Sequence, residues 1–295
     1  MNEDLELRLP FRAPLDAERL LGWLTARAVP GVEEVAGDVY RRSLRLPHGP
    51  GVVELAFAAD GVRCCLWLDN GRDVTVAVER CRRMLDLDAD PVAVAEHLGA
   101  DPLIGPLVAA APGLRVPGAV DGAELAVRTV LGQQVSVPAA RTGAGRLVAE
   151  HGEVLARPRG TVTALFPAPA VLGALDPARL AMPRARARAL VGLCRALAEG
   201  ALHLDAGADR AEMKRRLLAL PGVGPWTAGY IAMRALGDPD VFLAEDLGVR
   251  RALRRLGGPD DPRQARALAS AWAPWRSYAT QHLWQAPASA AALAA

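Results

Sequence analysis

Residues 220–225 read Leu-Pro-Gly-Val-Gly-Pro, and this stretch separates two segments with helical spacing. The segment before it, residues 209–219, is charged and amphipathic, and helical spacing resumes at residues 226–236. Gly222 and Gly224 let the backbone turn tightly, with no Cβ to cover the N–H groups near the start of the second helix. The stretch therefore predicts two helices joined by a short hairpin that is able to bind a phosphate.

This hairpin has two interpretations from the sequence alone. Pro and Gly also serve simply to connect packed helices, so the motif by itself does not separate a phosphate site from a connector. If the hairpin binds DNA, we expect the contacts to be made by Gly222, Val223, Gly224 and Thr227. Such contacts carry no sequence preference, because backbone amides and a helix dipole recognise the phosphates and not the bases.

An acidic residue stands at the start of the next predicted helix, which runs through Arg255. Asp246 would lie at or near the N-cap of this helix, where backbone amides and the helix dipole favour an ionised carboxylate. Taken alone, an aspartate in this position is usually a structural cap and nothing more. The surrounding sequence has to decide between a cap and a functional carboxylate.

Several separated segments resemble, in order, the helix-hairpin-helix DNA glycosylases, and in particular the bacterial DNA-3-methyladenine glycosylase II branch. The resemblance extends over about residues 5–285, and several motifs in the right order make a chance match much less probable than one motif does. The segments are Leu21–Leu24, Ala26–Val29, Val127–Val137, Leu220–Ala228, Asp246, Trp275–Ala279 and His282–Trp284.

The resemblance implies an α+β fold, in which an antiparallel-sheet domain similar to half of a TATA-binding protein precedes a mostly α-helical, two-lobed region. The local sequence patterns independently predict the same sheet domain. Alternating apolar positions flank the turn pair Asp60-Gly61, which indicates a strand hairpin, and residues 16–28 and 74–85 have helical spacing. From Pro91 onward the strand signals largely vanish. We expect the sheet domain at 1–90, the lobe with the catalytic carboxylate at 91–117 and 240–286, the hairpin lobe at 118–239 and a disordered tail at 287–295.

Carried over by motif position, the resemblance implies that Asp246 is the catalytic carboxylate. It implies a pocket for the flipped base formed by Gln133, Trp226, Tyr230 and Trp284. An isolated tryptophan is more often part of a core, and Trp272, Trp275 and Trp284 have spacings that fit one buried helix face. Only motif position favours a functional role for Trp226 and Trp284.

A glycosylase also fills the gap that the flipped base leaves in the duplex, usually with an apolar side chain. A related enzyme of this branch carries a leucine in this position, whereas this chain has Gln134. We therefore expect Gln134 to be the minor-groove wedge, with Val135 as the alternative.

The implied activity is hydrolysis of the N-glycosidic bond of alkylated bases, such as 3-methyladenine and 7-methylguanine, leaving an abasic site for base excision repair. We expect a monofunctional enzyme with no cofactor and no catalytic metal. One alternative is a noncatalytic helix-hairpin-helix DNA-binding protein, which has no use for a carboxylate that faces DNA. The other is a bifunctional glycosylase/lyase, which needs an amine nucleophile where this chain has Trp226. The only lysine, Lys214, lies on the preceding helix.

The amino-acid composition adds little to the prediction of function and partners. The formal net charge of the 295-residue chain is +2, so any DNA-binding surface must come from the placement of charges. The spacing of Cys64, Cys65, Cys81 and Cys194 fits neither a zinc site nor an iron–sulfur loop, which favours reduced thiols. The acidic N-terminus and the absence of a long apolar run favour a cytoplasmic protein with no membrane partner. The resemblance implies double-stranded DNA containing alkylated bases as the partner, and we expect a monomer.

Overall fold

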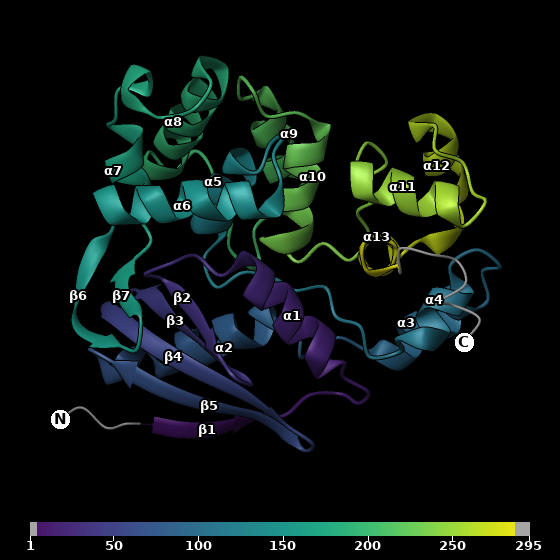
Figure 1. Cartoon of the computed structure of the whole chain (residues 1–295), viewed down its shortest axis with the longest axis horizontal. Coiled ribbons are helices and arrows are strands. Elements are labelled where there is room, and N and C mark those ends of the chain that lie inside the picture. Colours follow the sequence, from purple (N-terminus) through teal and green to yellow (C-terminus); the bar gives the residue numbers. More distant parts are fainter. Residues whose placement is uncertain (1–4, 287–295) are drawn as a thin grey trace.

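The computed structural model describes residues 5–286, so the predicted tail at 287–295 lies outside the described residues. Figure 1 shows a sheet at one end of the molecule, with helices above and beside it. The strands are β1 (Leu5–Leu9), β2 (Glu33–Ala36), β3 (Val39–Leu46), β4 (Gly49–Ala58), β5 (Gly61–Leu68), β6 (Glu153–Arg159) and β7 (Val162–Leu165). The helices are α1 (Ala17–Arg27), α2 (Val74–Met84), α3 (Pro91–Gly99), α4 (Gly105–Ala110), α5 (Gly122–Leu131), α6 (Val137–His151), α7 (Pro169–Gly173), α8 (Arg184–Ala198), α9 (Arg210–Ala219), α10 (Pro225–Arg234), α11 (Leu247–Arg255), α12 (Pro262–Leu268) and α13 (Arg276–Gln285).

The first five strands form one antiparallel sheet in the order β1-β5-β4-β3-β2, which confirms the predicted N-terminal antiparallel sheet. Ala58 pairs with Gly61, so the hairpin turn falls one residue earlier than the predicted Asp60-Gly61 pair. The alternating residues of β4 and β5 that face α1 and α2, such as Leu55 and Leu66, are fully buried. One face of the sheet is therefore covered by two helices, as the apolar spacing predicted.

The chain after residue 91 is mostly helical, as expected, but no strand was predicted for residues 153–165. There β6 and β7 form an antiparallel hairpin that packs on the other face of the sheet, against Val52 and Trp67. Most side chains of β6 are exposed, so the segment has no alternation of buried and exposed positions. The pairing depends on contacts with distant residues, since Ser43 Oγ donates to Ala164 O at 2.7 Å.

The remaining helices form two groups around a common apolar core (Figure 1). Helices α5 to α10 lie on one side, with α9 and α10 in contact through the short turn predicted at 220–225. Helices α3, α4, α11, α12 and α13 gather on the other side. The boundaries proposed for the two lobes, 91–117 with 240–286 and 118–239, follow this grouping and remain a proposal.

A buried set of charges joins the sheet to α5, and we call it the arginine–glutamate cluster: Glu33, Arg42, Glu124 and Arg128. Arg42 of β3 pairs with Glu124 of α5 at 2.6 Å, and Arg128 of α5 pairs with Glu33 of β2 at 2.9 Å. Burial alone would raise the pKa of Glu33, but Arg128 and Arg42 lower it below its usual value. The two positive charges therefore offset the two negative charges, which allows all four groups to stay ionised in the interior.

Replacing Glu124 by glutamine should destabilise the protein strongly. The variant leaves two buried guanidinium groups facing one carboxylate, and an uncompensated buried charge costs about 3–5 kcal/mol. Glu153→Gln is the matched control, because Glu153 pairs with Arg45 on the surface with 57% of its side chain exposed. An exposed pair contributes less than about 1 kcal/mol. Urea denaturation should separate the two variants, and equal losses of unfolding free energy would contradict the role of the cluster.

Candidate active site

A cavity of about 370 Å³ lies where α1, α5, α6, α10, α11 and α13 meet. Its lining brings together residues that are far apart in the sequence, including three of the four residues expected around the base. The lining residues that the argument uses are Trp23, Arg27, Arg128, Arg141, Trp226, Tyr230, Arg234, Asp246 and Trp284. A volume of this size falls within the range of small-ligand sites.

Asp246 is the N-cap of α11, as the sequence predicted, and its Oδ1 accepts from Val249 N–H at 3.0 Å. Two indoles from other helices also donate to it. Trp284 Nε1 donates to Oδ1 and Trp226 Nε1 donates to Oδ2, each at 2.9 Å. An ionised carboxylate has about four acceptor sites, so three N–H donors leave one acceptor site, on Oδ2, among the described residues.

The aromatic rings of the cavity form a continuous series. Trp226 stacks on Tyr230, with ring centroids 5.4 Å apart. Tyr230 is tilted against Trp284 at 5.9 Å, and Trp284 stacks on Trp23 at 5.6 Å. Flat apolar surfaces of this kind bind an extruded base by stacking.

Two arginines contact these rings. The guanidinium carbon of Arg27 lies 3.3 Å from the centroid of Trp23, and that of Arg234 lies 5.4 Å from the centroid of Tyr230. Arg234 Nη1 also donates to Tyr230 Oη at 2.7 Å. Burial alone would raise the pKa of Tyr230, but Arg234 and Arg27 lower it below its usual value. Burial lowers the pKa of Arg27 to about 10.

Sequence reasoning did not assign Trp23 or Arg27 to the site. Both lie in segments that carry the family resemblance, and their separation of four residues places them on one face of α1. That spacing was the available signal. It does not show that α1, which belongs to the sheet domain, reaches the cavity of the helical region.

Gln133 does not lie in the base pocket where it was expected. It is absent from the cavity lining, because its Nε2 donates to Gly222 O at 2.9 Å and to Thr227 Oγ1 at 3.0 Å. Gln133 therefore braces the hairpin from the turn that follows α5. Next to it, Gln134 is exposed with φ +55°, and Val135 lines the mouth of the cavity with 39% of its surface exposed. Both remain candidates for the wedge.

The hairpin residues differ in whether their backbone N–H groups are free to bind a phosphate. Gly222 has φ +84°, and a Cβ there would lie 2.6 Å from Ala189 Cβ, so this glycine is needed for packing. Val223 N–H is occupied, since it donates to Leu220 O. Within residues 5–286, Gly224 N–H and Thr227 N–H have no acceptor, and nothing lies within 4 Å of a Cβ built on Gly224. Trp226 N–H also has no acceptor there, so three backbone N–H groups at the start of α10 are free donors.

The three tryptophans near the C-terminus have different environments. Trp272 is fully buried, and its Nε1 donates to Asp101 Oδ2 at 2.8 Å, so it belongs to the core. Trp275 packs edge-on against Tyr278. Trp284 alone of the three lines the cavity.

The four cysteines are free thiols, and Cys65 is the one that is partly exposed. Within residues 5–286, the acidic, histidine and cysteine side chains form no group of three that could hold a metal ion. The same residues include no helix with the length and apolar character needed to span a membrane.

Family models match two parts of the chain. The AlkA N-terminal domain matches residues 6–121, and the HhH-GPD superfamily of base excision DNA repair proteins matches residues 127–277. In three dimensions, a 3-methyladenine DNA glycosylase from Archaeoglobus fulgidus shares the fold with a TM-score of 0.79, at 20% identity over 95% of this chain and 97% of that one.

Two curated relatives are similar over nearly the whole chain. The Escherichia coli K12 protein DNA-3-methyladenine glycosylase 2 is 37% identical, over 94% of this chain and 95% of the relative. A Mycobacterium tuberculosis protein, a probable bifunctional transcriptional activator/DNA repair enzyme AlkA, is 55% identical over 95% of this chain. The match spans only 56% of that longer relative. Together with the two family models, these similarities show that the chain belongs to the HhH-GPD superfamily of base excision DNA repair proteins.

Proposed function

We propose that this protein is a monofunctional DNA glycosylase that flips an alkylated base out of duplex DNA and hydrolyses its N-glycosidic bond. The observation that carries the proposal is the place of Asp246. Its carboxylate faces an aromatic cavity, keeps one free acceptor site on Oδ2, and is held by Trp226 and Trp284. Membership of a base excision repair family and the similarity to DNA-3-methyladenine glycosylase 2 support the same reaction class.

The geometry suits a reaction in which the sugar becomes positively charged. Extruding a nucleotide costs a few kcal/mol, and the cost is lower where damage has weakened base pairing. As the base leaves, the sugar acquires oxocarbenium character, and a fixed negative charge stabilises it most strongly where water is excluded. The free acceptor site on Asp246 Oδ2 can orient a water toward the anomeric carbon.

A noncatalytic DNA-binding protein explains the hairpin but not the carboxylate. A helix cap needs only the bond from Val249 N–H to Asp246. The two additional indole donors hold the carboxylate in the cavity, which a protein that merely grips phosphates does not require. Double-stranded DNA with an alkylated base is the proposed partner, and the monomeric state and cytoplasmic location remain predictions.

Asp246→Asn should reduce base release by about 10²–10⁴-fold and leave DNA binding intact or tighter. Asparagine is itself a good helix cap, so the change removes the charge and little of the cap. Asp261→Asn is the matched control, because Asp261 caps α12 in the same way through Arg263 N–H and Gln264 N–H. Single-turnover assays on methylated duplex DNA measure the effect. Near-normal base release by Asp246→Asn would reduce this residue to a structural cap.

Gly224→Ala should weaken binding to undamaged duplex DNA without lowering protein stability. A Cβ at this position meets no protein atom within 4 Å, but it would stand beside the free Gly224 N–H where a phosphate would approach. Gly99→Ala, which is also free of contacts and lies on α3, should leave DNA affinity unchanged and should not lower stability, because alanine is the better helix former. Binding isotherms and thermal unfolding test both variants. Unchanged DNA affinity in Gly224→Ala would make the hairpin a mere connector.

Turnover should leave the abasic strand intact, with no covalent adduct when borohydride is present. A lyase needs an amine that attacks the anomeric carbon, and the indole nitrogen of Trp226 is not nucleophilic and donates to Asp246. Lys214 is exposed on α9 and is absent from the cavity lining. Denaturing electrophoresis after borohydride treatment gives the readout. A trapped adduct that disappears in Lys214→Ala would establish a bifunctional enzyme instead.

A further inference from the structure

The cavity is strongly basic, although the chain as a whole carries a formal net charge of only +2. Arg27, Arg128, Arg141 and Arg234 line it, against the single carboxylate of Asp246. Arg128 is paired with Glu33 and Glu124 in the arginine–glutamate cluster. Within residues 5–286, neither Arg27 nor Arg234 forms an ion pair with a carboxylate.

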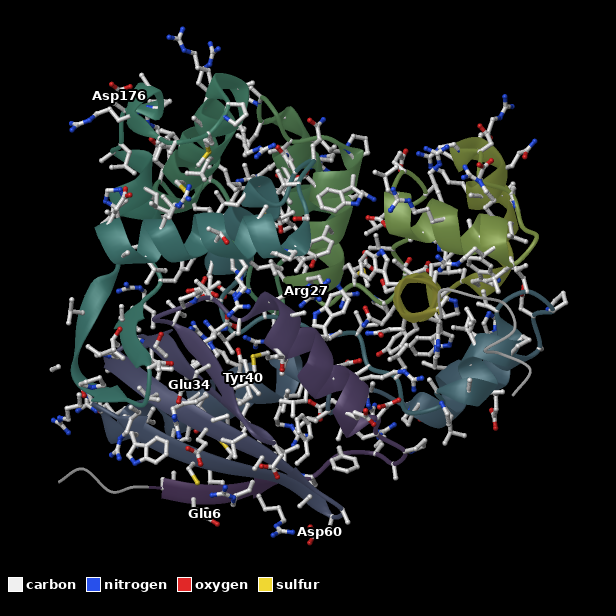
Figure 2. The ribbon with its side chains drawn as sticks, viewed as in Figure 1. Glu6, Arg27, Glu34, Tyr40, Asp60 and Asp176 are labelled. Atoms are coloured by element: carbon white, nitrogen blue, oxygen red, sulfur yellow. The ribbon has the colours of Figure 1, made fainter. Side chains whose placement is uncertain are left out.

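Arg27 is held firmly against the aromatic series. Its backbone carbonyl accepts from Arg128 Nη2 at 2.6 Å, which ties the end of α1 to α5. Its guanidinium carbon lies 3.3 Å from the centroid of Trp23, and Trp23 stacks on Trp284, which binds Asp246. Figure 2 shows Arg27 at the point where α1 approaches the helices above the sheet.

Arg27 lines the cavity, and much of its hydrogen-bonding capacity is not used by the described residues. A guanidinium has five N–H donors. Those of Arg27 reach Trp23 O, at the long distance of 3.4 Å, and interact with Tyr230. Burial lowers the pKa of Arg27 to about 10, which still leaves the group protonated near neutral pH. A base that enters the cavity therefore meets a charged donor.

We propose that Arg27 is a specificity-determining residue that favours a neutral base with a carbonyl acceptor, such as a 6-oxopurine, over a cationic base. The inference rests on the proposed glycosylase function. A cationic base would be repelled by the guanidinium in a region of low dielectric, and the cation–π position over Trp23 is already occupied by Arg27. A neutral base avoids the repulsion, and its carbonyl can accept a charge-assisted hydrogen bond.

Two substrates separate the effect of base charge from the effect of the carbonyl acceptor. 7-Methylguanine and hypoxanthine both carry a carbonyl at purine position 6, but only 7-methylguanine is cationic within DNA. We would measure single-turnover release of each base from otherwise identical duplexes. The intrinsic reactivity of each lesion cancels, because every variant is compared with the wild-type enzyme on the same substrate.

The ratio of the 7-methylguanine rate to the hypoxanthine rate should rise about tenfold in Arg27→Gln, which corresponds to about 1.4 kcal/mol. Arg27→Met should behave in the same way, and it covers the case in which the glutamine variant fails to fold. Arg27→Lys retains the charge and should keep the wild-type ratio. Arg141→Gln removes an exposed arginine from the rim of the cavity, and should change both rates by the same factor.

An unchanged ratio in a folded Arg27→Gln or Arg27→Met variant would overturn the inference and leave the glycosylase function standing. A wild-type enzyme that binds duplex DNA but releases neither base would instead contradict the proposed function, and the inference with it. A ratio that rises equally in Arg27→Lys would show that the shape of the arginine, and not its charge, decides selectivity, which also contradicts the proposal.

Discussion

The arginine–glutamate cluster is the constraint on which the site depends. Four ionised side chains lie between the sheet and α5, three of them buried and Arg128 partly buried, and each needs the others because an unpaired charge in the interior is strongly unfavourable. Arg128 extends this network to the backbone of Arg27, at the end of α1. The sheet domain is thereby fixed to the helical region in one orientation, and α1 presents Trp23 and Arg27 to a cavity that is otherwise built from helices.

Asp246 shows how one residue meets a structural and a functional demand together. As an N-cap, it satisfies Val249 N–H at the start of α11. As the proposed catalytic group, it requires a fixed orientation, which Trp226 and Trp284 supply through their indole N–H groups. The same two rings form walls of the cavity, so the surface proposed to stack the flipped base also sets the position of the carboxylate proposed to act on its sugar.

The cavity also changes how recognition of the base has to be understood. Aromatic rings alone would favour cationic bases through their negative faces. Here Arg27 lies over Trp23 and Arg234 lies over Tyr230, and among the described residues only Asp246 supplies negative charge to the lining. Under the proposed function, the balance between the guanidinium groups and the carboxylate is the electrostatic variable on which we propose that selection between a cationic and a neutral base depends.

The sequence by itself determined most of the elements and the family: the sheet hairpin, the helix at residues 16–28, the hairpin between α9 and α10, and the cap at Asp246. These features follow from local periodicity, turn residues and caps, which act over a few residues. Aspartate also caps α3, α5, α9 and α12, so capping alone could not single out Asp246. Only the tertiary structure decided that Gln133 braces the hairpin, that β6 pairs with β7 on the sheet, and that Trp23 and Arg27 line the cavity. Each of these depends on contacts between residues far apart in the chain, and the energies of such contacts have no signature in local spacing.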